Sequence, residues 1–148
     1  MSKEDVTHLR ALERMYLAAP INQLYLPTIA VSEGEAEISI ELQLAYHHAA
    51  GAVHGSVYFK MLDDAAFFAA NSLEPEYFVL TASFTTYLIR PVTKGVMRSV
   101  GRVVNQTKNQ FIAESVAYDS RGKEIARGNG IFVKGKLPLR EAMGYSDD

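Results

Sequence analysis

The sequence predicts an α+β fold in which a curved antiparallel sheet wraps around one long central helix. Three observations favour this architecture. Residues 57–71 are apolar on most sides, which is typical of a buried helix. Residues 36–44 alternate apolar and polar side chains, as a strand with one buried face does. After residue 76 the chain has the pattern of strands joined by short turns, which makes neighbouring strands antiparallel.

The N-terminal part predicts an extra helix and a hairpin. Residues 4–18 have a helical apolar period, with Pro20 closing the helix and residues 21–27 forming a loop. Residues 28–32 and the strand over 36–44 flank a turn rich in Ser, Glu and Gly, so they are expected to pair. The expected helix face is Val6, Leu9, Leu12 and Tyr16, and the expected strand face is Ile38, Ile40, Leu42 and Leu44.

The rest of the chain supplies the central helix and the remaining strands. Ser56 is the expected N-cap of the helix. The tail after Lys136 contains Pro138, Gly144 and acidic residues, so we expect it to be a loose end. The chain is thus one domain over 1–148, with an N-terminal helix in 1–20, a core over about 28–135 and a loose tail over 137–148. The expected strands are 77–89, 95–105, 110–119 and 123–135.

Composition excludes several classes of function. The chain has 15 basic and 17 acidic residues without a basic block, so nucleic-acid binding is not expected. There is no cysteine, which removes disulfides, thiolate metal ligands and a cysteine nucleophile. No apolar run approaches the ~20 residues that span a bilayer, and the N-terminus does not resemble a signal peptide. We therefore expect a cytoplasmic protein that neither spans a membrane nor needs a cofactor.

The segment before the central helix is the most unusual local feature. Residues 51–56 contain two glycines and His54 between a strand and a helix. Glycines let the backbone approach a ligand, and the start of a helix offers free N–H groups and a positive dipole end. A developing oxyanion could therefore be bound by the N–H of Gly55 or Ser56.

Asp63 is the second candidate group, because it lies on an apolar stripe of the same helix. Its helical neighbours are Phe59, Ala66 and Ala70, and a carboxylate in such surroundings needs a partner or a task. Burial would raise its pKa towards neutrality, as a general base or nucleophile requires. Asp64 differs, because Lys60 one turn earlier predicts an ordinary surface ion pair.

These motifs resemble those of the PaaI-type acyl-CoA thioesterases of the hotdog superfamily. The resemblance is carried by His54-Gly55-Ser56 with an Asp nine residues after the His, and by Arg90-Pro91 at a strand end before Gly95. It covers roughly residues 28–135. It implies a hotdog fold and hydrolysis of acyl-CoA or acyl-carrier-protein thioesters. It also implies a homodimer or homotetramer, in which the Asp of one copy faces the His-Gly segment of another.

The resemblance also implies a role for each matching residue. Asp63 would activate water or attack the thioester carbonyl, and the N–H of Gly55 would polarise that carbonyl. His54 would orient the carbonyl or assist the departing thiolate. Thr81 would help to position water, with Ser83 as the alternative if the alignment slips, and Thr81, Ser83 and Thr85 are expected to share one strand face.

Two positions depart from the family pattern. Ser56 stands where the family has a second glycine, and His48, in a pair of histidines expected to end a strand, stands where it has an asparagine. His48 could donate a hydrogen bond in place of the amide, which would add pH dependence. These departures motivate the alternative of a hotdog module that binds acyl-CoA without turnover. Ser56, Ser83 and Arg90 are expected to bind substrate; Arg90 could reach a CoA phosphate or form a surface ion pair.

Other readings of the same residues have less support. The spacing of His47, His48, His54 and Asp63 matches no metal signature, and no serine-hydrolase elbow, P-loop or dinucleotide fingerprint is present. A hotdog dehydratase or hydratase is a third option without a matching catalytic set. The aromatic residues of the central helix are expected to form core or dimer contacts rather than an acyl pocket: Tyr58, Phe59, Phe67 and Phe68.

Overall fold

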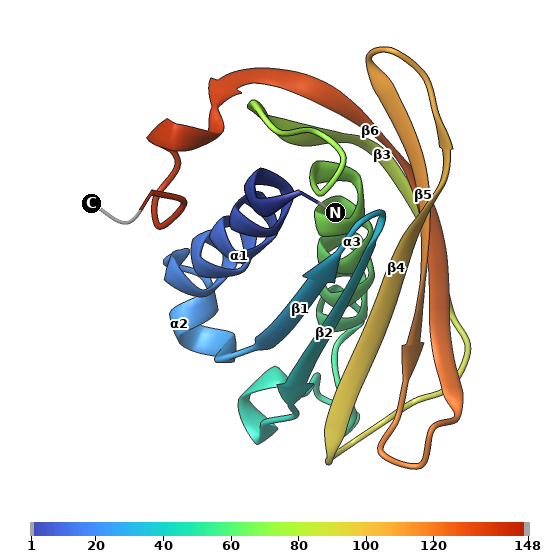
Figure 1. Cartoon of the computed structure of the whole chain (residues 1–148). Helices are drawn as coiled ribbons and strands as arrows, with labels where there is room; N and C mark the ends of the chain where they lie inside the picture. The colour runs from blue at the N-terminus through green and yellow to red at the C-terminus, as the bar shows by residue number, and fades with distance from the viewer. Residues whose placement is uncertain (1, 147–148) are drawn as a thin grey trace.

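One antiparallel sheet curves around the long helix α3 (Gly55–Asn71), as Figure 1 shows for the computed structural model, which describes residues 2–146. The strand order is β1-β2-β4-β5-β6-β3, so β1 and β3 are the two edges. The predicted α+β hotdog architecture is confirmed. The other elements are α1 (Lys3–Ala18), α2 (Asn22–Tyr25), β1 (Thr28–Ser32), β2 (Glu35–Glu41), η1 (Leu44–Tyr46), β3 (Tyr77–Leu88), β4 (Val96–Gln106), β5 (Gln110–Tyr118), β6 (Glu124–Pro138) and η2 (Leu139–Glu141).

Helix α3 is seated on the concave face of the sheet by close packing and by two hydroxyl groups. Gly101 of β4 lies so near the backbone of Ala65 and Ala66 that any side chain there would overlap the helix. The hydroxyls of Ser99 and Ser115 are buried and donate to carbonyl oxygens of α3, each at 2.7 Å. These contacts fix the height and rotation of α3, and therefore the direction in which Asp63 points.

Helix α1 covers the other side of α3 and runs antiparallel to it. His8 near its start donates from Nε2 to the carbonyl oxygen of Asn71, 2.9 Å away at the end of α3. Further along α1, the hydroxyl of Tyr16 donates to Asp64 at 2.7 Å. Helix α2 also contacts α3, because Oδ1 of Asn22 accepts a hydrogen bond from Lys60. The N-terminal segment is therefore packed along most of α3.

Three expectations about the N-terminal half are wrong. Residues 21–27 contain the short helix α2, because Asn22 donates to the carbonyl oxygen of Tyr16 and holds the chain in a turn. The strand expected over 36–44 ends at Glu41, since its partner β4 begins at Val96. Leu44 then lies in η1 and is 82% exposed instead of facing the core.

The C-terminal tail is also packed, contrary to the expected loose end, for residues 137–146. Leu139 is buried, and the hydroxyl of Tyr145 lies 2.7 Å from Nδ1 of His8. Gly144 adopts a φ of +82° and lies against the backbone of Met15, which a side chain would not allow. The tail thus packs through Leu139, Gly144 and Tyr145, whereas Leu137 and Met143 remain exposed. Residues 147–148 lie outside the described part.

Candidate active site

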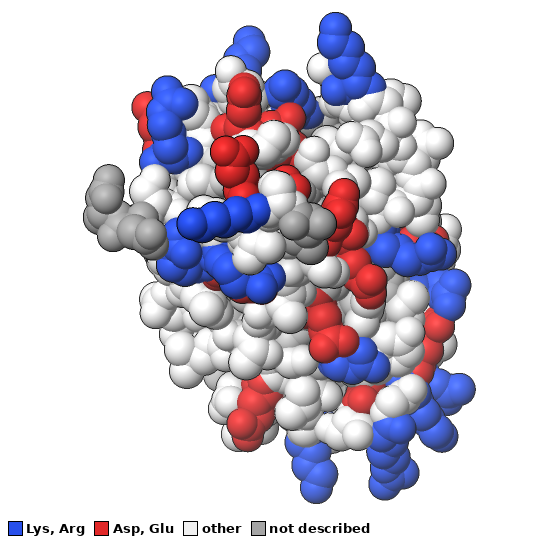
Figure 2. Space-filling view, in the orientation of Figure 1, with Lys and Arg blue, Asp and Glu red and all other residues white. Residues whose placement is uncertain are grey.

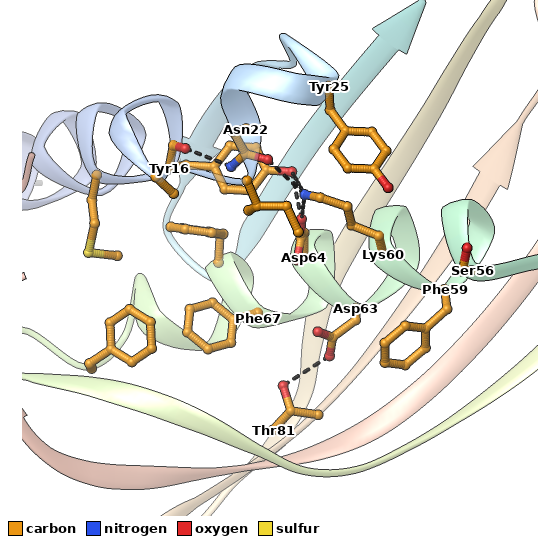
Figure 3. A pocket seen from close by; sticks show the side chains of 15 residues that line it. Tyr16, Asn22, Tyr25, Ser56, Phe59, Lys60, Asp63, Asp64, Phe67 and Thr81 are labelled. Atoms are coloured by element: carbon orange, nitrogen blue, oxygen red, sulfur yellow. Dashed lines mark hydrogen bonds and ion pairs between the residues drawn. The ribbon is translucent and has the colours of Figure 1, made fainter. Parts of the chain in front are cut away.

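A cleft of about 490 Å³ lies between helix α3 on one side and helices α1 and α2 on the other (Figure 3). Strand β3 closes it with Phe78 and Thr81. Asp63 points into this cleft from the middle of α3, between Phe59 and Phe67 on the same helix. Four further lining residues are apolar, and the others are polar or tyrosine side chains: Met15, Ala19, Ile21 and Phe68, then Tyr16, Asn22, Tyr25, Ser56, Lys60 and Asp64.

Asp63 is a half-buried carboxylate with one direct hydrogen-bond partner. The hydroxyl of Thr81 donates to its Oδ1 at 2.9 Å. Burial raises the pKa of Asp63 to about 6, although the Thr81 hydrogen bond acts in the opposite direction, and Asp64 adds to the rise. A carboxylate with such a pKa is ionised at neutral pH yet basic enough to take a proton from water. The structure thus places three of the predicted site residues, Ser56, Asp63 and Thr81, around one cleft.

Asp64 belongs to a network that ties α1 and α2 to α3, and the expected surface ion pair is wrong. Lys60 Nζ lies 2.6 Å from the Asp64 carboxylate, and the two side chains are only 12% and 20% exposed. The same ammonium donates to Asn22 at 2.8 Å and to the Tyr16 hydroxyl at 3.3 Å. Burial and the neighbouring Asp64 raise the pKa of Tyr16, which therefore stays protonated as a donor.

The start of α3 forms a second constellation. His54, not Ser56, is the N-cap: its Nδ1 accepts from the backbone N–H of Ser56 at 3.0 Å and lies 2.8 Å from the Ser56 hydroxyl. Because Nδ1 accepts a backbone proton, the proton of the neutral ring is on Nε2. The N–H of Ser56 is thereby used. The N–H of Gly55 makes no hydrogen bond to any part of the chain that the structure describes, so it is the available oxyanion donor.

His48 lies beside this constellation, in the loop after η1 rather than at a strand end. Its Nδ1 accepts from the backbone N–H of Ala50 at 3.0 Å, which leaves Nε2–H as a donor. The rings of His48 and His54 are 6.5 Å apart. A hollow of about 330 Å³ is lined by His48, Gly55, Leu88 and Arg90, among others. These residues therefore face one shared space at the N-terminus of α3.

The Asp63 carboxylate and the Gly55 N–H do not meet within one copy of the chain, although Ser56 lines the cleft of Asp63. Asp63 follows Gly55 by eight residues, which is about 12 Å along a helix. Ser83 joins neither constellation: a bulge between Thr81 and Ser83 pairs Thr81 with the buried Phe132 and Ser83 with Ile131. Ser83 consequently points to the outer face, is exposed and does not line the cleft, so the expected shared face with Thr81 is wrong.

The residues that α1 and α2 bring to the cleft were not predicted as site residues. They come from positions before residue 28, outside the stretch that carries the family resemblance. One signal pointed to them: Lys60 and Asp64 lie on an otherwise apolar helix, so burying them requires further polar partners. Tyr16, Asn22 and Tyr25 are those partners, with the Lys60 ammonium 5.0 and 4.9 Å from the two tyrosine ring centres.

A groove of about 670 Å³ adjoins the hollow at the start of α3 and collects cations. It is lined by Arg90, Lys94, Arg121 and Lys123. Within residues 2–146 none of these four has a carboxylate within ion-pair distance, whereas Arg98, Arg102 and Arg127, for example, are paired. Asp119 in the groove accepts the backbone N–H groups of Lys123 and Arg121, and these hydrogen bonds, together with the charges of the same two residues, lower its pKa. Figure 2 shows basic side chains gathering at the lower end of the molecule, where Figure 1 places the β3–β4 and β5–β6 turns.

Residues 2–146 contain neither a cluster of metal ligands nor a membrane-spanning helix. In the described part of the chain, no three His, Asp or Glu side chains are grouped so that they could hold a metal ion. No helix within residues 2–146 is both long and apolar enough to cross a bilayer.

The chain belongs to the thioesterase superfamily, whose sequence model matches residues 50–126. This range contains the start of α3, Asp63, Thr81 and Arg90. A protein of Sulfurisphaera tokodaii named "Putative esterase" is 24% identical over 102 residues, which cover 69% of this chain and 76% of that protein. The family and this relative support a hydrolase of thioester or ester bonds.

Solved structures of PaaI proteins share the fold. The PaaI protein from the phenylacetic acid degradation operon of E. coli superposes with a TM-score of 0.83 at 17% identity, over 92% of this chain and 99% of that one. A mutant of the phenylacetic acid degradation protein PaaI from Thermus thermophilus superposes with a TM-score of 0.72 at 19% identity, over 79% of this chain and 100% of that one. The E. coli match extends over more of this chain.

Proposed function

We propose that the protein hydrolyses acyl-CoA thioesters at a site shared by two copies of the chain. The observation that carries this proposal is the half-buried carboxylate of Asp63, which points into a largely apolar cleft. Burial raises the pKa of Asp63 to about 6. As a general base it takes a proton from water, which attacks the thioester carbonyl while Thr81 holds the carboxylate in place. The N–H of Gly55 stabilises the oxyanion. The C–S bond then breaks, the proton held by Asp63 passes to the departing thiolate, and the carboxylic acid and the thiol leave. The same carboxylate, attacking directly, would form an anhydride that water then cleaves.

The free edge of β3 supports the sharing of the site. This edge strand spans 12 residues, and the strand and the residue after it expose large apolar side chains, including Leu80, Tyr87, Leu88 and Ile89, each 47–56% exposed. A long unpaired edge with apolar side chains is a ready template for pairing with another strand. In the proposed dimer, the β3 strands of two copies pair antiparallel, so that the backbone N–H and C=O groups of this edge form hydrogen bonds.

Such pairing would also unite the two constellations. Along β3, Thr81 is bonded to Asp63, and Leu88 lies against Gly55. An antiparallel pair of β3 strands centred on Thr85, with Ala82 left unpaired by the bulge, sets Thr81 of one copy opposite Leu88 of the other. Asp63 of one copy then approaches the start of α3 in the second copy. A substrate can then contact both groups, although Gly55 and Asp63 of one copy are about 12 Å apart along α3.

The cation groove supports coenzyme A as the thiol carrier, because its phosphates need unpaired cations. We expect the double substitution Lys94→Glu and Arg121→Glu to raise KM for acyl-CoA about tenfold, since it removes two exposed ionic contacts and adds repulsion. The kcat should change little, because neither Lys94 nor Arg121 lines the cleft of Asp63 or the hollow at the start of α3. Thiol release from an acyl-CoA measures both constants.

The matching control uses a substrate without phosphates. The KM for the corresponding acyl-pantetheine should be the same in the double variant and the natural protein. Lys108→Glu, an exposed cation in the β4–β5 turn outside the groove, should leave both substrates unaffected. An equal rise of KM for both substrates would assign the groove to something other than the nucleotide.

A hotdog module that binds acyl-CoA without turnover is the second candidate function. One contact at the start of α3 favours it. The Ser56 hydroxyl is 2.8 Å from His54 Nδ1. A glycine at position 56 would make no such side-chain contact with the ring. A panel of butyryl-, octanoyl- and phenylacetyl-CoA, with thiol release and binding both measured, separates the two functions. Binding without release across the panel would reject the enzyme and favour the module.

A further inference from the structure

The cleft continues past Asp63 into an apolar end. Phe67 follows Asp63 by one helical turn on the same face of α3. Its ring packs against those of Phe68 and Phe78, with centroid distances of 5.2 and 5.1 Å. Met15 of α1 lines the same space. We call these four residues, Met15, Phe67, Phe68 and Phe78, the apolar end of the cleft.

Helix α1 forms a wall that follows α3 along this end. The antiparallel contacts run from Tyr16–Asp64 to His8–Asn71, so α1 stays on α3 from the level of Asp63 to the C-terminus of α3. The rings of Tyr16 and Phe68 meet edge to face at 4.9 Å. From Asp63 to Phe68 the helix rises by about 8 Å. The apolar end of the cleft therefore extends along α3 from the level of Asp63 to that of Phe68.

Lys60 and Tyr25 lie on the side of Asp63 away from Phe67, and Thr81 contacts Asp63 from β3 (Figure 3). Lys60 directs its three N–H donors at Asp64, Asn22 and Tyr16, so it has none left for a ligand. The apolar end itself presents only hydrocarbon, aromatic rings and a thioether. A group bound there must be uncharged and free of unsatisfied hydrogen-bonding atoms.

We propose that the apolar end binds the alkyl chain of a medium-length aliphatic acyl group, with α1 as its outer wall. This inference rests on the proposed function, because Asp63 sets where the acyl carbonyl lies. An extended chain can contact the wall over its whole length within the 490 Å³ cleft. An acetyl group would leave Phe67 and Phe78 in water, and a compact aryl group would fill only the part nearest Asp63.

Binding of S-alkyl-CoA thioethers tests the inference without turnover, since thioethers have no carbonyl to attack. Calorimetric Kd values should fall about fourfold for each added methylene, from butyl upward, and become constant once the chain reaches the end wall. S-octyl-CoA should bind more tightly than S-(2-phenylethyl)-CoA, which has the same number of carbons. A Kd independent of chain length, or tighter binding of the phenylethyl compound, would overturn the proposal.

Phe78 provides variants with opposite expected effects. Phe78→Ala should move the constant region to longer chains, and Phe78→Trp should move it to shorter ones. Leu17→Ala is the control, because Leu17 is 45% exposed on α1 and does not line the cleft. Opposite shifts cannot come from general destabilisation, and an identical plateau in all four proteins would overturn the proposal. Absence of thiol release from every acyl-CoA would instead reject the proposed function, because the Kd series is independent of hydrolysis.

Discussion

Asp63→Asn should lower kcat for thioester hydrolysis by about 10²–10⁴-fold while the fold is retained. The amide keeps the size of the carboxylate, and its oxygen can still accept from the Thr81 hydroxyl. What it loses is the ability to take a proton from water or to attack a carbonyl. Steady-state thiol release with saturating acyl-CoA measures the effect. An Asp63→Asn protein with natural activity would exclude Asp63 as base and as nucleophile.

The same substitution should stabilise the protein at alkaline pH, which separates loss of chemistry from loss of structure. The pKa of Asp63 rises from 3.8 to about 6 on folding, so the carboxylate is harder to ionise in the folded state. The natural protein therefore loses stability as pH rises through this interval, and the asparagine variant does not. After allowance for partial exposure, we expect the variant to be about 2 kcal/mol more stable at pH 8, and no more stable below pH 4.

Asp64→Asn provides the contrast, because it should shift the free energy of unfolding in the opposite direction. This change leaves the half-buried Lys60 without its carboxylate partner. Removal of one member of a buried polar pair destabilises a protein. Urea unfolding at pH 8 compares the two variants, and equal signs would contradict the different environments assigned to the neighbouring carboxylates.

Gly55→Pro should lower kcat by about 10²–10³-fold, because it deletes the one N–H of the α3 start that is free to bind an oxyanion. Gly55 is the first residue of α3, a position at which proline fits a helix. The preceding His54 already has the extended conformation that proline requires, with φ −63° and ψ 143°. The substitution thus removes a donor with little demand on the backbone.

Gly55→Ala is the matched control, since it adds a side-chain carbon and keeps the N–H. That carbon would lie 3.0 Å from the Leu88 Cδ1, at the end of a flexible side chain that can give way. We expect the alanine variant to keep most of the activity that the proline variant loses. Equal losses in the two variants would attribute the effect to crowding against Leu88 and would contradict a role for the N–H.

The long periodic elements could be predicted from the sequence because their burial follows from local patterns. An apolar stretch of α3 and alternating strands leave few ways to bury their faces, and the four later strands occur close to the expected ranges. The Asp63 position could be singled out for the same reason, as a charge on a buried helix. The side of β3 that carries each hydroxyl could not be predicted, because the bulge before Ser83 interrupts the alternation.

The N-terminal wall of the cleft and the packed tail depend on contacts between distant parts of the chain. Tyr16 meets Asp64 across 48 residues, and His8 meets Tyr145 across 137. No local period encodes such pairs. The N-cap of α3 could not be predicted either, because ordinary capping preferences favour Ser56 over His54. His54 can cap the helix because its Nδ1 is unprotonated and accepts a backbone N–H.

Complementation between two inactive variants tests the shared site most directly. In a mixed dimer of Asp63→Asn and Gly55→Pro chains, one of the two sites combines an intact Asp63 with an intact Gly55 from the other chain. If the site is shared, mixing the unfolded variants in equal amounts and refolding them should restore about a quarter of the natural activity, since half of the dimers are mixed and each has one intact site. Mixed dimers that form, as native mass spectrometry would show, yet remain inactive would contradict a site built from Asp63 of one copy and the α3 start of the other.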